Sequence, residues 1–478
     1  MSQKPSMSNV ELRQLPSIDA LLQTDTAKAL RQAMGTDQLT SLARKVTDGL
    51  RREILAGGVQ FTESSQNGTR ATLLEEAELR LVTAHELESA SRLRRVINAT
   101  GVILHTNLGR APLSEAARRA ITEAASGYCT LEYDVAGGTR GRRGAGAEDL
   151  LAYLTGAEAA LVVNNCAAAA LLVLTVLARD GETIVSRGEL VEIGGDFRVP
   201  DVMDQSGTHM IEVGTTNRTR LSDYRKALSE QTRLIMRVHT SNYRIVGFTR
   251  TASLRELAGL AHEAGLILYE DAGSGALVDF NKYEITGEPV IRASIEDGAD
   301  VVSFSGDKLV GGPQAGLVVG RAALIERMRS HPLYRALRAD KLRFAALEAT
   351  LDAYARGAST GEVPVHRLIA SSSKEIEARA EALIQRLRLA KVDGELRTET
   401  VTGESAIGGG SAPTSRLPTL LISLTHTRLT PNQIEAALRH SDPPVIARIV
   451  DDRVLIDLRT VFPSEESDIE RAVLAFAS

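Results

Sequence analysis

The apolar and polar positions of the first ninety residues follow a helical period. Apolar residues there recur every three or four positions, which is the spacing of an amphipathic helix. The clearest series is Leu39, Leu42, Val46, Leu50 and Ile54. A second, charged helix is predicted at about Leu73–Leu87. The arginines and lysines between these positions, such as Arg44 and Lys45, are typical of a solvated helix face.

From Asn98 onward, short apolar runs alternate with helical stretches. The predicted strands are Ala160–Val163, Thr183–Val185, Met210–Val213, Arg233–Val238, Leu266–Asp271, Val301–Phe304 and Gly316–Val319. Helical segments such as Leu221–Leu228 and Leu254–Ala264 lie between them. Strands that alternate with helices predict an α/β domain, in which a mostly parallel sheet is covered on both faces.

The remainder predicts a long helical region over about 321–354 and then a smaller α/β domain. Its expected elements are strands at Leu420–Leu424 and Val454–Leu458 and helices at Ser372–Leu387 and Pro431–His440, with Gly408–Gly410 in a loop between elements. A chain of 478 residues is too long for one hydrophobic core. We therefore expect a helical domain over 1–90, a catalytic domain over 91–350 and a small domain over 351–478.

Composition narrows the class of protein only a little. The formal charge of −5 and the pI near 6.1 give no sign of nucleic-acid binding, although an acidic protein can carry a local basic face. Two cysteines, Cys129 and Cys166, cannot build a disulfide framework or a multi-cysteine zinc site. The N-terminus lacks a signal-peptide core, and the apolar run Cys166–Ala178 is too short to span a bilayer. A cytoplasmic location follows by elimination.

The strongest chemical signal is Lys308, in a turn of small residues directly after a predicted strand. A lysine that forms a Schiff base must reach a carbonyl, while a carboxylate holds the far side of the cofactor ring. Asp271, at the end of an earlier strand, could supply that carboxylate. The polar turn and helix start at Asn165–Ala167 could bind a phosphate through free backbone amides. These features predict a site for pyridoxal 5′-phosphate (PLP), with Ser305 of the lysine turn as a further contact.

Each of these features has an ordinary alternative. Most lysines after strands lie on the surface, and an aspartate at a strand end is usually a turn or cap residue. Their order favours the cofactor site, because the phosphate turn, Asp271 and Lys308 each follow a strand. Ligands of open parallel sheets bind at those carboxyl ends. The lysine turn is not a Walker loop, since no glycine precedes Lys308 directly and no Ser or Thr follows it.

Three arginines are candidates for binding an oxyanion. Arg110 ends an unusual polar stretch, and Arg335 and Arg338 are three apart on a predicted helix and so should face the same way. Ordinary surface or ion-pair arginines are the alternative. The segment Thr139–Arg143 could meet a phosphate backbone or form a solvated turn. No histidine has companions at metal-ligand spacing, and we expect no metal site.

Four stretches together resemble one protein family. They are Arg95–Ser114 with its His-Thr-Asn-Leu-Gly-Arg motif, Val185–Gly195, Glu212–Arg218 and Ser303–Gly316. They are similar to bacterial selenocysteine synthase, the L-seryl-tRNA(Sec) selenium transferase, and Leu12–Leu22 is similar to the start of that family. The resemblance runs from about residue 10 to the C-terminus.

The resemblance implies a PLP enzyme of the aspartate-aminotransferase-like fold (fold type I). Such an enzyme converts L-seryl-tRNA(Sec) to L-selenocysteinyl-tRNA(Sec), by β-elimination of the serine hydroxyl and addition of selenium from selenophosphate. Lys308 matches the PLP lysine and Asp271 the partner of the ring nitrogen, while Arg110, Arg335 and Arg338 match arginines for selenophosphate. The resemblance also implies a tRNA-binding N-terminal domain and a homo-oligomer, usually a decamer built as a pentamer of dimers.

The sequence departs from the family pattern at three positions. The family often has Asn where Cys166 stands, and Tyr and His where Gly144 and Gly146 stand. Two other functions compete with the family's reaction. One is a lyase on the same scaffold that acts on a small amino acid or amino sugar acid, which would have no need for a tRNA-binding domain. The other is a non-catalytic tRNA-binding protein, against which Asp271 and Lys308 both argue.

Overall fold

The computed structural model describes residues 12–477 apart from residues 13, 57–69, 91, 195–196 and 391–394. The chain divides into two compact units, Met1–Arg95 and Val96–Ser478. The expected boundary near residue 90 lies close to this division. The expected boundary between residues 350 and 351 falls within a helix of the second unit, and the three-domain division stays a prediction.

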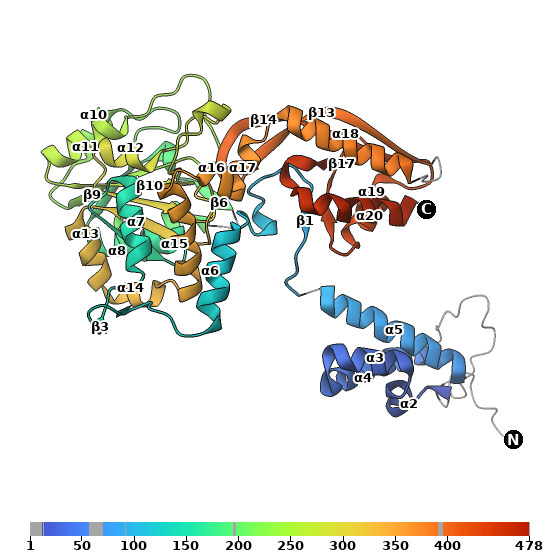
Figure 1. The fold of residues 1–478 in the computed structure, drawn as a ribbon. Coiled ribbons are helices and arrows are strands. Elements are labelled where there is room, and N and C mark those ends of the chain that lie inside the picture. Colours follow the sequence, from blue (N-terminus) through green and yellow to red (C-terminus); the bar gives the residue numbers. More distant parts are fainter. Residues whose placement is uncertain are drawn as a thin grey trace. The chain divides into compact units, whose positions relative to one another are not determined.

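The first unit is helical, as the apolar period predicts (Figure 1). Its helices are α2 (Ile18–Leu22), α3 (Asp25–Met34), α4 (Thr36–Leu55) and α5 (Arg70–Ala90). All five apolar residues of the predicted series are buried along α4. Ser17 and Thr24 cap α2 and α3 by accepting a backbone N–H, which satisfies a donor that a helix start leaves free.

The charged side chains of this unit are partly paired. Arg80 of α5 donates to Glu53 of α4 at 2.7 Å and to Glu76 of its own helix at 2.6 Å, which joins the two longest helices. Arg44 and Lys45 are exposed on α4. A solvated helix face therefore accounts for some of the basic residues, and Arg44 and Lys45 remain accessible to a partner.

A seven-stranded sheet forms the centre of the second unit. Its strands are β4 (Ala159–Val163), β5 (Glu182–Ser186), β8 (His209–Val213), β9 (Thr232–Val238), β10 (Ile267–Gly273), β11 (Val301–Ser305) and β12 (Gly316–Gly320). The strand order is β4-β12-β11-β10-β9-β5-β8. Within this described sheet, β12 runs opposite to the other six strands, which all run in one direction. The predicted strands and the mostly parallel sheet are confirmed.

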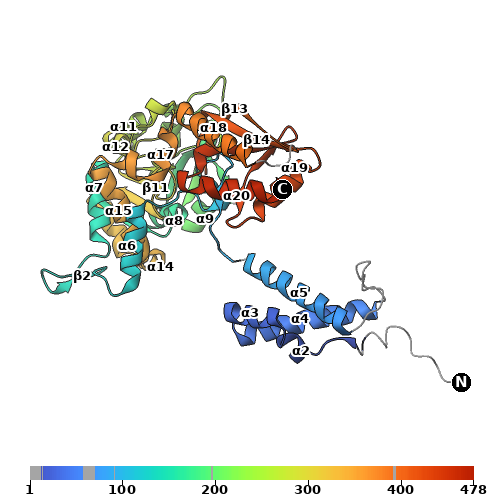
Figure 2. The same ribbon diagram turned by 45° about the vertical axis from the view of Figure 1, so that its right-hand side comes forward.

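Helices cover both faces of this sheet (Figure 1, Figure 2). They are α7 (Ala145–Thr155), α8 (Cys166–Leu177), α9 (Val199–Ser206), α10 (Leu221–Ala227), α11 (Leu254–Glu263), α12 (Ile291–Glu296), α13 (Ala322–Ser330) and α15 (Lys341–Ala355). Successive strand residues point to opposite faces. Val301 thus belongs to the buried cluster that includes residues of α8 and α13, whereas Val302 belongs to the cluster on the other face that includes residues of α7, α12 and α15.

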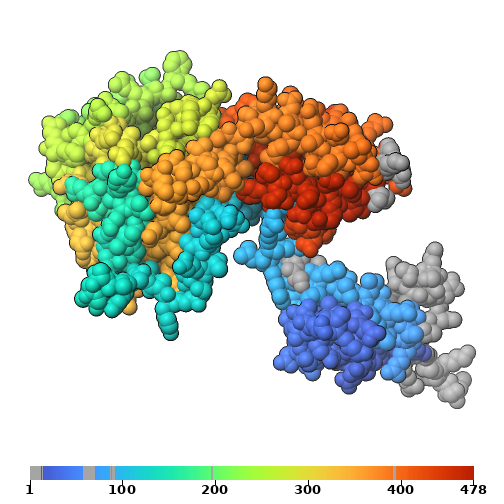
Figure 3. Space-filling model, viewed as in Figure 1, coloured from blue at the N-terminus to red at the C-terminus, as the bar shows by residue number. Residues whose placement is uncertain are grey.

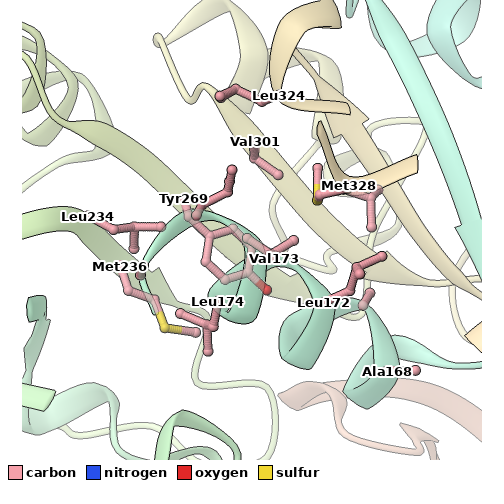
Figure 4. Close-up of a cluster of buried hydrophobic side chains, with 14 of the residues drawn as sticks. Ala168, Leu172, Val173, Leu174, Leu234, Met236, Tyr269, Val301, Leu324 and Met328 are labelled. Carbon is pink, nitrogen blue, oxygen red and sulfur yellow. The ribbon is translucent and has the colours of Figure 1, made fainter. Parts of the chain in front are cut away.

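The core on the α8 face is continuous and apolar. Figure 4 shows Tyr269 of β10 among Val173 and Leu174 of α8 and Met236 of β9. The hydroxyl of Tyr269 does not stay unpaired, because it lies 2.7 Å from Oγ of Ser303 on the neighbouring strand. This core holds β10 and β11 rigidly beside each other, and both strands lead into the candidate site.

The long helical region predicted over about 321–354 is confirmed, and the structure divides it into three helices. Between α13 and α15 lies α14 (Pro332–Leu337). Proline at the start of α14 cannot continue the preceding helix, and Asp340 caps α15 by accepting the N–H groups of residues 342 and 343. Arg338 lies beyond the end of α14 in an extended conformation (φ −58°, ψ 136°) and does not share a helix face with Arg335.

A four-stranded sheet follows toward the C-terminus. Its strands, in the order β13-β14-β17-β16, are β13 (Leu396–Gly408), β14 (Ser411–His426), β17 (Arg453–Asp457) and β16 (Arg448–Val450). The helices α18 (Ser373–Leu389), α19 (Pro431–Arg439) and α20 (Glu466–Ala477) pack on it. In the space-filling view, these orange and red residues gather in one lobe of the second unit (Figure 3). The predicted elements are present, but β13 was missed.

Gly408–Gly410 is the tip of a long β13–β14 hairpin and not the loop between separate elements that the sequence suggested. All three glycines have positive φ, which other residues seldom adopt.

The remaining elements are the helix α6 and several short helices, strands and turns. They are α6 (Glu115–Ser126), α16 (Ser359–Glu362), α17 (Pro364–Ala370), β1 (Ile97–Asn98), which pairs with β15 (Val445–Ile446), β2 (Tyr133–Asp134) with β3 (Thr139–Arg140), β6 (Glu192–Gly194) with β7 (Phe197–Arg198), and the 3-10 turns Thr106–Leu108, Arg187–Glu189, Asn281–Tyr283, Leu458–Thr460 and Pro463–Glu465. Within the described residues, every helix is too short or too polar to cross a membrane.

Candidate active site

A cavity of about 590 Å³ lies where β4, β10 and β11 end. This is the edge of a parallel sheet at which ligands bind. The lining residues include all the predicted cofactor contacts and Arg110. They are Thr106, Asn107, Arg110, Asn165, Cys166, Ala167, Ile193, Gly194, Asp271, Gly273, Ser305, Asp307, Lys308, Gln314, Gly409 and Gly410. The structure thus brings together residues that are up to three hundred positions apart in the sequence.

Lys308 is 3 % exposed and follows the end of β11. Burial lowers the pKa of its amine, and the nearby cation of Arg110 lowers it further, whereas the carboxylates of Asp271 and Asp307 act in the opposite direction. A buried lysine with a lowered pKa is more often neutral, and the neutral amine is the nucleophile and the base. The environment therefore prepares Lys308 to attack a carbonyl.

Asp271 lies on β10, beside β11 in register with Ser303. Its Oδ1 accepts hydrogen bonds from Oγ of Ser303 at 3.1 Å, from the N–H of Gly273 at 3.3 Å and from Sγ of Cys166 at 3.5 Å. Burial raises the pKa of this carboxyl group, while these donors and the charge of Lys308 oppose the rise. A cationic ring nitrogen next to Asp271 would further favour the carboxylate.

The turn after β4 forms the cradle that the sequence predicts for a phosphate. Asn165 caps α8 by accepting the N–H of Ala168 at 2.9 Å, and Cys166 begins the helix. The first N–H groups of a helix have no intrahelical acceptor, and they attract anions. Gly316 makes this arrangement possible, because a Cβ there would stand 2.1 Å from the carbonyl oxygen of Asn165.

The backbone conformation of Arg110 and its contact with the carboxylate of Asp307 fix the position of its side chain. It has φ of 60°, a conformation that is uncommon for a residue with a side chain. Its guanidinium donates to Asp307 at 3.0 Å, and the N–H of Ala111 donates to the carbonyl of Asp307 at 3.3 Å. Asp307 directly precedes Lys308. The lysine turn and the predicted anion-binding arginine are therefore held to each other.

The structure places Arg335 and Arg338 outside the lining of this cavity. Arg335 is exposed at the end of α14. Arg338 forms an ion pair with Glu132 at 3.4 Å. Of the three predicted anion-binding arginines, Arg110 alone shares the cavity with Lys308 within the described part of this one chain.

Sequence reasoning missed the hairpin tip and a buried serine. A Cβ at Gly410 would lie 3.6 Å from Nζ of Lys308 and 3.5 Å from Oγ of Ser241, so the absence of a side chain keeps space open beside the lysine. Ser241 is fully buried, and its hydroxyl has no hydrogen-bond partner among the described residues. The three successive glycines Gly408–Gly410 were the one sequence feature that could have indicated the hairpin tip. No feature of the sequence around Ser241 indicated that this residue belongs near the site.

These features fit the PLP that the resemblance implies. The cavity offers a buried lysine, a buried carboxylate and a helix start on its wall, and the unpaired hydroxyl of Ser241 lies next to Gly410, outside the lining residues. These are the groups that an aldehyde, a ring nitrogen, a phosphate and a further polar atom would need. Asp271, Lys308 and the Asn165–Ala167 turn would hold the cofactor, with Ser305 beside them.

Two of the departures from the family pattern have a structural account. Gly144 has φ of 62°, and a Cβ there would stand 2.0 Å from the ring of Phe344. A Cβ at Gly146 would stand 2.7 Å from the carboxylate of Glu348. Side chains of α15 thus fill the space that larger residues at 144 and 146 would need. At Cys166, burial raises the pKa of the thiol, which therefore stays protonated and able to donate to Asp271.

The arginines of the Thr139–Arg143 segment are paired. Arg140 and Arg143 form ion pairs with Glu132 at 2.9 Å and 2.6 Å, and Arg142 pairs with Asp149. These contacts favour a solvated turn over a nucleic-acid contact.

A buried histidine beside the lysine turn makes stability depend on pH. His366 lies with its Nε2 3.0 Å from the carbonyl oxygen of Leu309, and burial lowers its pKa from 6.5 to about 4. The unfolded chain therefore binds a proton between these values when the folded chain does not, and stability is lost as pH falls from 6.5 toward 4. The difference between the two pKa values corresponds to about 3 kcal/mol of unfolding free energy.

Denaturant unfolding of His366→Gln should show a weaker loss of unfolding free energy between pH 6.5 and pH 4. The exposed His209→Gln is the control and should follow the parent, and an identical profile for both variants would contradict the assignment.

Comparisons with known proteins extend along almost the entire chain. Residues 96–462 match the family model described as L-seryl-tRNA selenium transferase, and residues 12–51 match the selenocysteine synthase N-terminal model. An L-seryl-tRNA(Sec) selenium transferase of Moorella thermoacetica is 47% identical over 464 residues, covering 97% of this chain and 96% of the relative. The one of Geobacter sulfurreducens is 43% identical over 465 residues, covering 97% and 99%.

A solved structure of D-glucosaminate-6-phosphate ammonia-lyase shares the fold. It has a TM-score of 0.57 and 20% sequence identity, and it covers 83% of this chain and 98% of its own. The sequence relatives are far more similar, and the model for the N-terminal region matches this chain as well. The resemblance drawn from the motifs is confirmed: the chain belongs to the family of L-seryl-tRNA(Sec) selenium transferases, the bacterial selenocysteine synthases.

Proposed function

We propose that this chain converts L-seryl-tRNA(Sec) to L-selenocysteinyl-tRNA(Sec) with PLP as cofactor and selenophosphate as selenium donor. The observation that carries the proposal is the cavity at the strand ends, where the buried Lys308 and Asp271 lie together in a chain of this family. Bound PLP would supply an electron sink that stabilises negative charge at the serine Cα.

Lys308 would act as both anchor and base. With PLP bound, the neutral Nζ of Lys308 would take the Cα proton of the serine, and burial favours this neutral form because it lowers the pKa of the amine. The serine hydroxyl leaves Cβ as water after gaining a proton. The selenium of selenophosphate would then bond to Cβ, water would cleave its P–Se bond so that phosphate leaves, and Lys308 would return a proton to Cα. Asp271 would hold the ring nitrogen protonated throughout.

Arg110 is the arginine best placed to bind the phosphate part of selenophosphate. Its guanidinium lines the cavity and could exchange its contact with Asp307 for a contact with an anion. Arg335 and Arg338 also match the family's donor arginines. We propose that a second copy in a homo-oligomer, expected to be a decamer, brings these two arginines to the cavity.

The N-terminal unit is proposed to bind the tRNA. Its exposed Arg44 and Lys45 offer positive charge to a phosphate backbone, although the chain as a whole is acidic. A lyase for small substrates would have no use for this unit. We also propose that the enzyme acts in the cytoplasm, where its tRNA substrate is found.

The test is a reconstituted reaction. Purified protein, seryl-tRNA(Sec) and selenophosphate should produce selenocysteinyl-tRNA, detected as labelled selenium on the tRNA, and serine on an ordinary serine tRNA should remain unchanged. The competing lyase predicts ammonia from D-glucosaminate 6-phosphate and no selenium on tRNA. That pair of results would overturn the proposal.

A further inference from the structure

A second cavity, of about 340 Å³, lies next to the first and shares none of its lining residues. Its wall combines the ends of β5 and β9 with the segments 216–219, 243–245, 249–251 and 286–288 and with residues 413–414 of the β13–β14 hairpin. Threonines and arginines make up half of this lining, and none of its residues takes part in the reaction proposed above.

The hairpin tip separates the two cavities. Gly409 and Gly410 line the first cavity, whereas Pro413 and Thr414 line the second. The other boundary is His239, which lines the second cavity while its N–H donates at 2.9 Å to the carbonyl of Asp271. A molecule whose reacting end lies beside Lys308 therefore has only this thin wall between it and the second cavity.

Three arginines of the second cavity have no carboxylate partner within 4 Å among the described residues. They are Arg218, Arg244 and Arg250. The backbones of Arg218 and Arg250 form a parallel bridge, so these two positions lie side by side. Arg244 donates to Oγ1 of Thr414 at 3.3 Å, which places its guanidinium at the hairpin.

The carboxylates of the same cavity are already engaged. Glu189 lies 3.3 Å from Arg237 and accepts the N–H of Val238 at 3.0 Å. Glu288 accepts from Ser274 and from the N–H of Ala412. The cavity therefore presents more free positive than negative charge, with threonine hydroxyls around it, which is the chemistry that binds phosphate groups.

We infer that the second cavity binds phosphate groups of the acceptor end of seryl-tRNA while the seryl group occupies the first cavity. The inference rests on the proposed function. Selenophosphate is a poorer occupant, because its selenium must touch Cβ of serine in the first cavity and cannot do so from behind the hairpin tip. Contacts to a part of the substrate that does not react anchor the tRNA end and position its seryl group.

The experiment compares R218Q, R244Q and R250Q, alone and combined, with the parent enzyme. Steady-state selenium transfer is measured against seryl-tRNA(Sec) and, separately, against selenophosphate, at several salt concentrations. The combined variant should raise KM for seryl-tRNA(Sec) about tenfold or more and leave KM for selenophosphate unchanged. Each lost phosphate contact should reduce the slope of log KM against log salt by about one.

Matched variants separate charge from folding. R218K, R244K and R250K keep the positive charge and should recover most of the tRNA affinity, while R397Q, on an exposed residue of β13 that lines neither cavity, should behave as the parent. The visible absorbance of bound cofactor reports that each variant is folded, and the single variants remain informative if the combined one is not.

The outcomes are distinct. An unchanged KM and salt slope for seryl-tRNA(Sec) in folded variants would overturn the inference, and so would an effect confined to selenophosphate. If the parent enzyme itself transfers no selenium to seryl-tRNA(Sec), the proposed function fails, and the inference fails with it.

Discussion

Lys308→Ala is expected to abolish selenium transfer to seryl-tRNA(Sec) and the covalent attachment of cofactor together. The amine of Lys308 lies in the cavity, next to the space that Gly410 leaves open. Burial lowers the pKa of this amine. Loss of a positioned base alone costs about 10²- to 10⁴-fold in rate. Loss of the anchor adds to this cost. Transfer of labelled selenium measures the first effect, and mass spectrometry after borohydride reduction measures the second.

Two further measurements sharpen this prediction. Lys308→Arg keeps a cation in the cavity but cannot form the covalent link, and it should be as inactive as the alanine variant. A small primary amine added to Lys308→Ala should restore a fraction of the rate, because it can replace the missing base. Normal turnover by either variant, or borohydride-stable cofactor at another residue, would remove Lys308 from the mechanism.

The strands and the two central residues of the site could be predicted from the sequence because their signals are local. Each buried strand is a short apolar run between turn residues, and Asp271 and Lys308 each follow such a run. Since the carboxyl ends of parallel strands meet at one edge, their proximity followed from the predicted topology. The cavity confirms that proximity.

What could not be predicted depends on contacts across long sequence separations. The hairpin tip that lies next to Lys308 is about one hundred residues away from it in the sequence. Along β13, exposed residues alternate with half-buried ones, so the strand has no apolar run that would have predicted it. The position of Arg338 depends on where α14 ends, and helical spacing alone does not show that end. The second cavity is assembled from several loops, whose arginines look like ordinary surface residues in the sequence.

Asp271→Asn is expected to slow selenium transfer by about 10²- to 10³-fold while the cofactor stays attached to Lys308. The amide has nearly the same shape as the carboxyl group and can still accept from Ser303, but it cannot carry the negative charge that would hold a proton on the cofactor's ring nitrogen. The electron sink therefore weakens, and removal of the Cα proton becomes slower. Single-turnover kinetics with seryl-tRNA(Sec) measure this step, and the visible absorbance reports cofactor attachment.

Glu270→Gln is the matched control for this prediction. Glu270 is the neighbouring buried residue of β10 and also has a pKa raised by burial, but it does not line the cavity. It should therefore leave the rate nearly unchanged. Ser303→Ala removes one of the hydrogen bonds to Asp271, which is worth about 1 kcal/mol, and should slow the reaction about tenfold at most. The same change also removes the partner of the Tyr269 hydroxyl. If Asp271→Asn and Glu270→Gln had the same small effect, a general change in the strand would explain the result, and the ring nitrogen would need another partner.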